Sequence, residues 1–264
     1  WDNETCQVFT TLNAVAYGNS TFVAVGASGR IIRSTNNASS WHNSTSGTTT
    51  TFNGVTYGNG NFAAVGNSGI IRSSTDGSSW TSRYTAGYAL YGAAYGNSTY
   101  VGVGYYYNVR STNLSSWSRP SPSYYRSRNH RGVTYGGGST FVGVGDYGKI
   151  IKTTNSGSSW DNMTTGLSPY TAPSGSLSLR GVAYGNSTFV AVGQSGTILT
   201  STDGETWESQ TSGTSNYLTA VAYGNSTFVA VGLSGTILTS TNGTSWTTRT
   251  SGTTNALYGV TFGE

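Results

Sequence analysis

Few side chains in this sequence offer the chemistry that catalysis or metal binding requires. The 264 residues include 9 Asp or Glu, 2 His and 1 Cys, and only 8% of the chain is charged. Neither His42 nor His130 belongs to a metal-binding motif such as His-Glu-x-x-His, and the single Cys6 cannot form a disulfide within the chain or a cysteine-based zinc site. Because catalysis needs several titratable groups that converge, we expect no enzyme activity, no metal site and no cofactor.

Basic residues are distributed unevenly along the chain. Residues 1–152 carry a net charge of +7 and residues 153–264 a net charge of −3. Four basic residues recur at one position of a repeated segment and are expected to lie on a common arc: Arg33, Arg72, Arg110 and Lys152. Two interpretations stay open, a strand face that uses Arg for solubility and an anion-facing arc for an acidic glycan or another subunit. Nucleic acid is not expected, because the density of Lys and Arg is low and no recognition motif is present.

Tyrosine and arginine gather where the third repeat departs from the others. Aromatic rings that stack on sugars beside Arg donors make a carbohydrate site a reasonable hypothesis, since loops on rigid scaffolds often carry function. The alternatives are a solvated loop and cation–π pairs within the fold. The candidate ligand-binding residues are Tyr105, Tyr106, Tyr107, Tyr124, Tyr125, Arg126, Arg128 and Arg131.

Asn-x-Ser/Thr sequons are frequent, and together with the low charge they favour an extracellular, glycosylated surface protein. The chain starts at Trp1 rather than Met, so we expect either that a leader has been removed or that the sequence is a fragment. Cys6 is expected to be a small apolar residue, with an intermolecular bridge as the alternative. The candidate glycosylation sites are Asn3, Asn19, Asn37, Asn43, Asn97, Asn113, Asn162, Asn186, Asn225 and Asn242.

The elements that must position these residues come from an internal repeat. Gly is 38 of 264 residues, no apolar run approaches the ~18 residues of a membrane span, and no window has a helical pattern. A phrase of the type Gly-Val-Ala-Tyr-Gly recurs seven times, and six times it is followed by a Phe-Val-Ala-Val-Gly strand and an Ile-Ile-Arg-Ser strand. A Trp closes each unit after about four strands, at Trp41, Trp80, Trp117, Trp160, Trp207 and Trp246. Units of about 40 residues predict a soluble, all-β propeller as one domain over 1–264.

The turn before each of these Trp residues carries a family signature. Turns such as Ser-Thr-Asp-Gly-Ser-Ser-Trp at 74–80 and Thr-Thr-Asn-Ser-Gly-Ser-Ser-Trp at 153–160 resemble the Asp-box repeat, Ser-x-Asp-x-Gly-x-x-Trp, although four turns are one residue shorter. The whole unit is similar to the propellers of photosystem II assembly and stability factors. The resemblance implies a propeller fold, while its members include sialidases, sorting receptors, lectin-like proteins and assembly factors. A sialidase would need an arginine triad, a Tyr nucleophile with a Glu and an acid Asp, and these cannot be matched to positions here.

Both ends of the chain add strands to the six complete blades. Trp1-Asp-Asn-Glu-Thr repeats the closing strand at Trp160-Asp-Asn-Met-Thr, and residues 259–264 repeat an inner strand. The ends either dock on a six-bladed ring, build an uneven seventh blade, or exchange between subunits, since unpaired strand edges invite another chain.

We therefore predict a non-catalytic extracellular binding or scaffold protein of a surface or filament assembly. Its expected partners are further copies of itself, as a homopolymer or oligomer, or carbohydrate, with no nucleic acid and no membrane span. A glycan-binding lectin is the first alternative. A sialidase-like glycosidase and an assembly chaperone are weaker ones.

Overall fold

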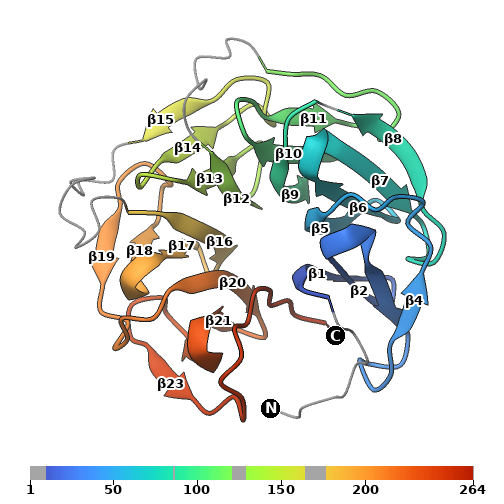
Figure 1. The fold of residues 1–264 in the computed structure, drawn as a ribbon. Coiled ribbons are helices and arrows are strands. Elements are labelled where there is room, and N and C mark those ends of the chain that lie inside the picture. The colour runs from blue at the N-terminus through green and yellow to red at the C-terminus, as the bar shows by residue number, and fades with distance from the viewer. Residues whose placement is uncertain (1–9, 86, 121–128, 164–176, 264) are drawn as a thin grey trace.

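Six antiparallel sheets surround a central axis and make a six-bladed β-propeller (Figure 1). The computed structural model describes residues 10–85, 87–120, 129–163 and 177–263. Each sheet runs from an innermost to an outermost strand in chain order. The first three blades comprise β1 Leu12–Gly18, β2 Thr21–Gly26, β3 Ile31–Ser34, β4 His42–Ser44; β5 Phe52–Gly58, β6 Asn61–Gly66, β7 Ile70–Ser74, β8 Thr81–Thr85; and β9 Leu90–Gly96, β10 Thr99–Gly104, β11 Val109–Ser111.

The second half of the ring repeats this order. In every blade the third strand is shorter than the innermost strand. The blades comprise β12 His130–Tyr135, β13 Phe141–Gly145, β14 Ile150–Thr153, β15 Asp161–Met163; β16 Leu179–Gly185, β17 Thr188–Gly193, β18 Ile198–Ser201, β19 Glu208–Gln210; and β20 Leu218–Gly224, β21 Thr227–Gly232, β22 Ile237–Ser240, β23 Thr247–Arg249.

The predicted all-β propeller is confirmed, with one local difference in the third blade. Its sheet has three strands, and the fourth is reduced to a single bridge between Arg110 and Ser118. In this blade Leu114 takes the turn position that Gly77 holds in the second blade, at φ 62° against 73°. The Leu114 side chain is buried and packs with Tyr100 and Trp117, so packing compensates for a backbone conformation that favours glycine.

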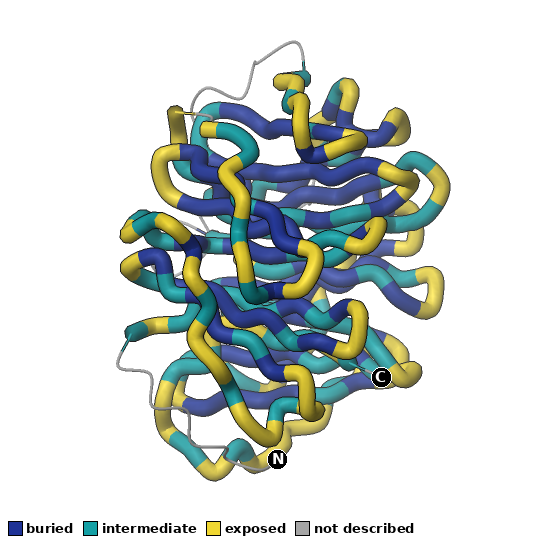
Figure 2. The backbone as a smooth tube through the Cα atoms, turned by 90° about the vertical axis from the view of Figure 1, so that its right-hand side faces the viewer, coloured by how far each residue is buried: buried dark blue, intermediate teal, exposed yellow. Residues whose placement is uncertain are grey.

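Glycine lets neighbouring blades approach closely. Four inner strands end in a Gly that lies against an aromatic ring of the next blade, as Gly58 does against Tyr95. The hydrophobic core consists of clusters between successive blades, for example the one that joins Val23 and Val25 with Phe52 and Phe62. Burial therefore follows the strands, while the turns at both rims are exposed (Figure 2).

The turn before each Trp is held by side-chain hydrogen bonds. The Asp76 carboxylate accepts bonds from the backbone N–H groups of Ser78 (2.8 Å) and Ser79 (3.2 Å), and from the Ser74 hydroxyl (2.9 Å). The N–H bond from Ser78 lowers the pKa of Asp76 below its usual range. Each acidic or amide side chain at this position thus fixes a turn, as sequence reasoning predicted for such residues.

The chain after β23 returns to the inside of the ring. Residues 257–263 lie between the last sheet and the first, drawn as the red segment near β1 (Figure 1). Gly259 approaches the backbone of Ala14, and Gly263 approaches the rings of Phe22 and Tyr17. This segment occupies the place of a seventh inner strand.

Candidate binding site at the channel mouth

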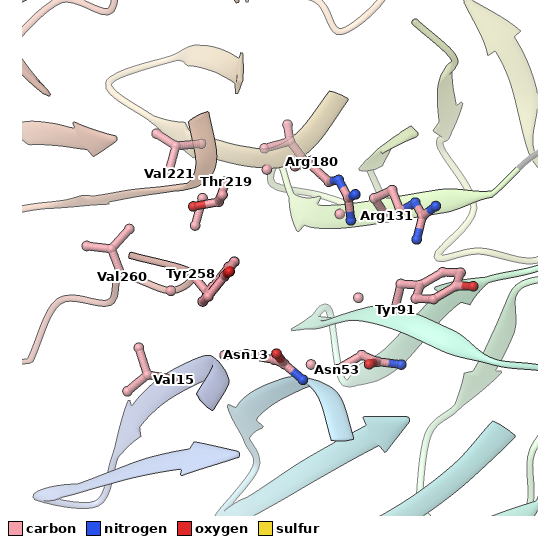
Figure 3. A pocket seen from close by; sticks show the side chains of 18 of the residues that line it. Asn13, Val15, Asn53, Tyr91, Arg131, Arg180, Thr219, Val221, Tyr258 and Val260 are labelled. Carbon is pink, nitrogen blue, oxygen red and sulfur yellow. The ribbon is translucent and has the colours of Figure 1, made fainter. Parts of the chain in front are cut away.

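The inner strands enclose a cavity of about 480 Å³ on the axis of the propeller (Figure 3). Every blade contributes to its wall, and so does the segment after β23. Beside Tyr217, seven polar and aromatic residues line this cavity: Asn13, Asn53, Tyr91, Arg131, Arg180, Thr219 and Tyr258. We call this set the mouth ring.

Six members of the mouth ring sit on β-bulges. In β1, Leu12 pairs with Gly26 and Ala14 pairs with Val25, so that Asn13 between them has no partner in the ladder. The same register shift occurs in all six inner strands and leaves out the residues Asn13, Asn53, Tyr91, Arg131, Arg180 and Thr219. A bulge re-aims its extra residue, and here it turns one side chain of each strand toward the channel.

Arg131 forms an ion pair with Asp146. Its guanidinium donates two hydrogen bonds to the Asp146 carboxylate, at 3.0 Å from Nε and 2.9 Å from Nη2. The same carboxylate accepts bonds from Asn129 (2.6 Å) and Ser178 (3.0 Å). Burial raises the pKa of Asp146, but these hydrogen bonds outweigh burial and lower the pKa overall. Asp146 therefore stays ionised and neutralises Arg131.

Aromatic rings flank both arginines. The Arg131 guanidinium lies 4.4 Å from the centroid of the Tyr91 ring, which is a cation–π contact. Arg180 donates a hydrogen bond from Nε to the Tyr217 hydroxyl at 2.6 Å and lies 5.4 Å from the centroid of that ring. Arg180 is exposed and forms no ion pair with any carboxylate of the described residues. Its positive charge is thus available at the mouth.

The other half of the ring is polar and uncharged. Asn13 donates to the carbonyl of Phe52 at 2.8 Å, and Asn53 donates to the carbonyl of Leu90 at 2.9 Å. These bonds tie each inner strand to the next blade. The mouth therefore has a structural side and, across the channel, a cationic and aromatic side (Figure 3).

The predicted Tyr105–Tyr107 segment lies beside the mouth ring. Tyr88 packs against Tyr106 with ring centroids 5.0 Å apart, and the Tyr105 hydroxyl donates to that of Tyr106 at 3.0 Å. This bond raises the pKa of Tyr105, and the nearby Tyr91 contributes to the shift. Tyr107 is buried under Arg119, whose guanidinium lies 4.2 Å from the ring centroid.

The structure joins this segment to only one other predicted ligand-binding residue. Arg131 contacts the Tyr91 ring, and Tyr91 in turn lies near enough to Tyr105 to contribute to its raised pKa. The remaining predicted residues lie outside the described part of the chain: Tyr124, Tyr125, Arg126 and Arg128.

The predicted basic arc lies between blades. Lys152 forms an ion pair with Glu205 of the next blade at 2.7 Å, and Arg110 donates to the Ser158 hydroxyl of the next blade at 2.9 Å. Arg72 donates to the carbonyl of Gly47 at 3.3 Å. These contacts engage three of the four predicted arc residues with the protein itself, while Arg33 of β3 is the fourth member. Its role toward an external anion stays a prediction.

The candidate glycosylation sites differ in their surroundings. Asn19, Asn186 and Asn225 occupy equivalent exposed hairpin tips with φ between 45° and 48°. Asn97 shares this position, but its amide donates to Ser139 at 3.0 Å and to Ser156 at 2.9 Å. Asn3 lies outside the described residues, as does Cys6.

Few acidic or metal-binding side chains come together. Among the described residues no three His, Cys, Asp or Glu side chains cluster. His42 is exposed on β4, and Glu208 is exposed on β19. Within the same part of the chain, no helix has the length and apolar character to cross a membrane.

Sequence reasoning missed most of the mouth ring, although a signal was present. The missed residue stands between a large residue and the Gly or Ala that begins the recurring phrase, as in Leu179-Arg180-Gly181. The repeats differ in chemistry at this position, with Asn, Tyr, Arg or Thr, which is typical of a site on a repeated scaffold. The missed members are Asn13, Asn53, Tyr91, Arg180, Thr219 and Tyr258.

Comparisons with known proteins identify the fold. No protein-family model and no curated protein sequence matches this chain. Its structure is similar to that of YCF48 bound to D1 peptide, with a TM-score of 0.67 and 18% identity over 90% of this chain and 81% of the other. YCF48 from Cyanidioschyzon merolae gives a TM-score of 0.72 at 11% identity, over 93% and 86% of the two chains.

A propeller of another class matches equally well. The WD40 repeats of RRP9 have a TM-score of 0.73 at 8% identity and cover 93% of this chain and 81% of the other. Such identities establish a shared fold only. The predicted likeness to propellers of photosystem II assembly factors is confirmed at that level.

Proposed function

We propose that this chain is a non-catalytic binding propeller whose mouth ring binds a carboxylate-bearing segment of a partner protein. The observation that carries the proposal is Arg180, an exposed guanidinium held by Tyr217 on a bulge beside the Arg131–Tyr91 pair. A fixed guanidinium binds a carboxylate through two parallel hydrogen bonds. The neighbouring tyrosines offer flat apolar surface for the rest of the segment.

The chemistry of the mouth favours binding over catalysis. The carboxylate that lies closest to the mouth arginines is Asp146, which is ion-paired to Arg131 and has a lowered pKa. A general acid at neutral pH needs a raised pKa instead. Peptide binding by a protein of this fold is reported in the structure of YCF48 with D1 peptide.

The proposal is tested with an array of peptides that end in a free carboxylate, each printed beside its amidated form. We expect preferential binding of the free acids and a loss of about 10-fold or more in Arg180→Gln, since a hydrogen bond to a charged group contributes about 1.5–3 kcal/mol. Arg249→Gln is the matched control, because Arg249 is an exposed Arg on β23 that donates to Thr239. Equal binding by wild type and Arg180→Gln would contradict the proposal.

Carbohydrate binding is a second candidate, supported by the exposed tyrosines beside the mouth. Tyr88 is 50% exposed and makes a tilted contact with Tyr105 and an edge-to-face contact with Tyr106, so its exposed ring offers a surface on which a sugar ring can lie. A glycan array read with wild type and Tyr105→Ala tests it. Binding that disappears in Tyr105→Ala supports a lectin, and a blank array removes this candidate.

We also propose that the protein works outside the cell, as part of a surface or filament assembly. The exposed hairpin tips at Asn19, Asn186 and Asn225 support this location, because they are accessible for glycosylation. In the turn before Trp80, the Asp76 carboxylate accepts hydrogen bonds from the Ser74 hydroxyl and the Ser78 N–H, which supports assignment of the repeat to the Asp-box type. Mass spectrometry of protein from its native source tests the sequons, and occupied sites require passage through a secretory route.

A further inference from the structure

The turn between β10 and β11 differs from the same turn in the other blades. In the third blade Tyr106 adopts a left-handed backbone conformation, with φ 71°. The other five blades have a Gly at this point of the turn, with φ between 66° and 70°: Gly29, Gly69, Gly148, Gly196 and Gly235. A positive φ is uncommon and strained for a bulky residue. An outlier of this kind is a reason to look for function at this turn.

The left-handed turn brings two successive tyrosines to the same side of the chain. Successive side chains of an extended strand point to opposite faces, whereas the rings of Tyr105 and Tyr106 have their centroids 3.9 Å apart. The Tyr105 hydroxyl donates a hydrogen bond to the Tyr106 hydroxyl at 3.0 Å. Because the hydroxyls meet, the ring carbons ortho to them lie beside one another. These are the carbons at which a phenoxyl radical forms carbon–carbon bonds.

Neighbouring groups hold this pair in place and leave it accessible. Tyr88 makes an edge contact with Tyr106, with ring centroids 5.0 Å apart. The backbone N–H of Tyr88 donates to the Tyr107 hydroxyl at 3.0 Å, and Tyr107 is itself buried under Arg119. Tyr105 and Tyr106 remain partly exposed. An oxidant from solvent thus meets two phenols whose relative position is already fixed.

A second pair of tyrosines in the same blade lacks these properties. The rings of Tyr95 and Tyr100 have their centroids 4.6 Å apart. Tyr100 is only 2% exposed, and its hydroxyl donates to the backbone carbonyl of Gly58. This hydroxyl is therefore engaged by the backbone and shielded from solvent. The pair is an internal control that has the ring contact without the access.

We propose that Tyr105 and Tyr106 are a site of oxidative modification, at which a haem peroxidase with hydrogen peroxide joins the two rings as dityrosine. Each tyrosine gives up one electron and its phenolic proton, and the two radicals form a bond between their ortho carbons. Each of these carbons then loses its hydrogen as a proton, and each oxygen regains one. In sum, two tyrosines and one hydrogen peroxide give one dityrosine and two water molecules. The bond closes the turn that leads into β11, in the blade whose sheet has three strands.

Oxidation of the full chain with a haem peroxidase and hydrogen peroxide tests this proposal. We expect a monomer that is lighter by two hydrogen atoms, that has dityrosine fluorescence, and whose peptide fragments lack only the cleavage between residues 105 and 106. Tyr105→Phe and Tyr106→Phe should each lower the yield at least about 10-fold, because phenols held in contact couple far faster than phenols that must meet by diffusion. Phe keeps the ring of either residue, so the fold is preserved. Tyr95→Phe should give the wild-type yield.

Other products would overturn the proposal. A bond from Tyr88 to either ring would suppress fragmentation over the whole span from residue 88 onward and would place the coupling elsewhere. A dityrosine that links two copies would appear as a covalent dimer whose yield rises with protein concentration. If the pair stays unmodified in protein that circular dichroism shows to be folded, under conditions that convert free tyrosine, its geometry does not permit coupling. None of these results depends on Arg180, so the mouth ring is tested separately.

Discussion

Between pH 6.5 and 4.5 this protein should lose stability, and most of that loss should disappear when one buried histidine is replaced. His130 is 1% exposed, and its Nδ1 lies 3.2 Å from Oδ1 of Asn108. Burial, helped by the nearby Lys149, lowers its pKa from 6.5 to about 4, against the opposing charge of Asp146. His130 occupies the place that Leu or Phe occupies in the other five blades.

The sign of this pH dependence follows from proton binding. Between pH 6.5 and 4 the unfolded chain protonates this histidine while the folded chain does not, so stability is fully present above pH 6.5 and falls as the pH is lowered. A pKa difference of about 2.5 units corresponds to about 2.5 kcal/mol lost by pH 4.5. The backbone N–H of Glu205 lowers the pKa of Asp203 to about 2, so protonation of Asp203 reduces stability only below about pH 4.

The assay is urea unfolding at pH 7.5, 6.5, 5.5 and 4.5. His130→Leu alone would leave the buried Asn108 amide without this partner, so the variant of choice is His130→Leu/Asn108→Ile, which restores the pair of apolar residues found in other blades. We expect this variant to have nearly the same free energy of unfolding at pH 7.5 and 4.5. His42→Gln, on the exposed strand β4, should leave the pH dependence of the free energy of unfolding as it is in the wild type. If the free energy of unfolding falls equally with pH in the double variant and in the wild type, the reasoning is refuted.

Three further substitutions test how the blades are built. Ala38→Gly should raise the free energy of unfolding by about 0.5–1 kcal/mol, measured by urea unfolding, because Ala38 has φ 66°. Gly58→Ala should destabilise by at least about 2 kcal/mol and lower Tm, since a Cβ at this position would overlap the Tyr95 ring, and an unchanged Tm would show that the ring can move away. Lys152→Gln should change stability by less than about 1 kcal/mol in thermal denaturation, because Glu205 is 60% exposed, and a larger loss would mean that the pair holds two blades together.

The repeat made the fold predictable from sequence. Seven recurrences of one phrase and six closing Trp residues define units that can bury their faces only against one another, which leaves few architectures besides a propeller. The turn residues Asp76 and Asp203 were also predictable, because a short carboxylate side chain has few partners other than the N–H groups of its own turn.

The candidate site was less predictable for two physical reasons. A bulge shifts the register of an inner strand by one residue, and this decides whether Arg180 faces the channel or the core; alternation alone does not show it. The partner of Arg131 is distant in sequence, since Asp146 follows the adjoining strand β13, and Asp146 is held in turn by Ser178, just before the first strand of the next blade. In the basic arc, by contrast, Lys152 and Arg110 of the periodic pattern contact the next blade.

Residues that differ among otherwise equal repeats are free of the packing demands that the repeats share. At the large position before each bulge, five of six blades have Leu or Phe, because that side chain must fill the same buried space. At the bulge itself no such space exists, so its residue is free to change without cost to the core. Two Asn residues there hold strands together, whereas Tyr91, Arg131 and Arg180 follow one another around a single side of the channel. A merely solvated rim would not need the aromatic contacts that hold both arginines in place, and this is the reason to look for the ligand of this protein at that side.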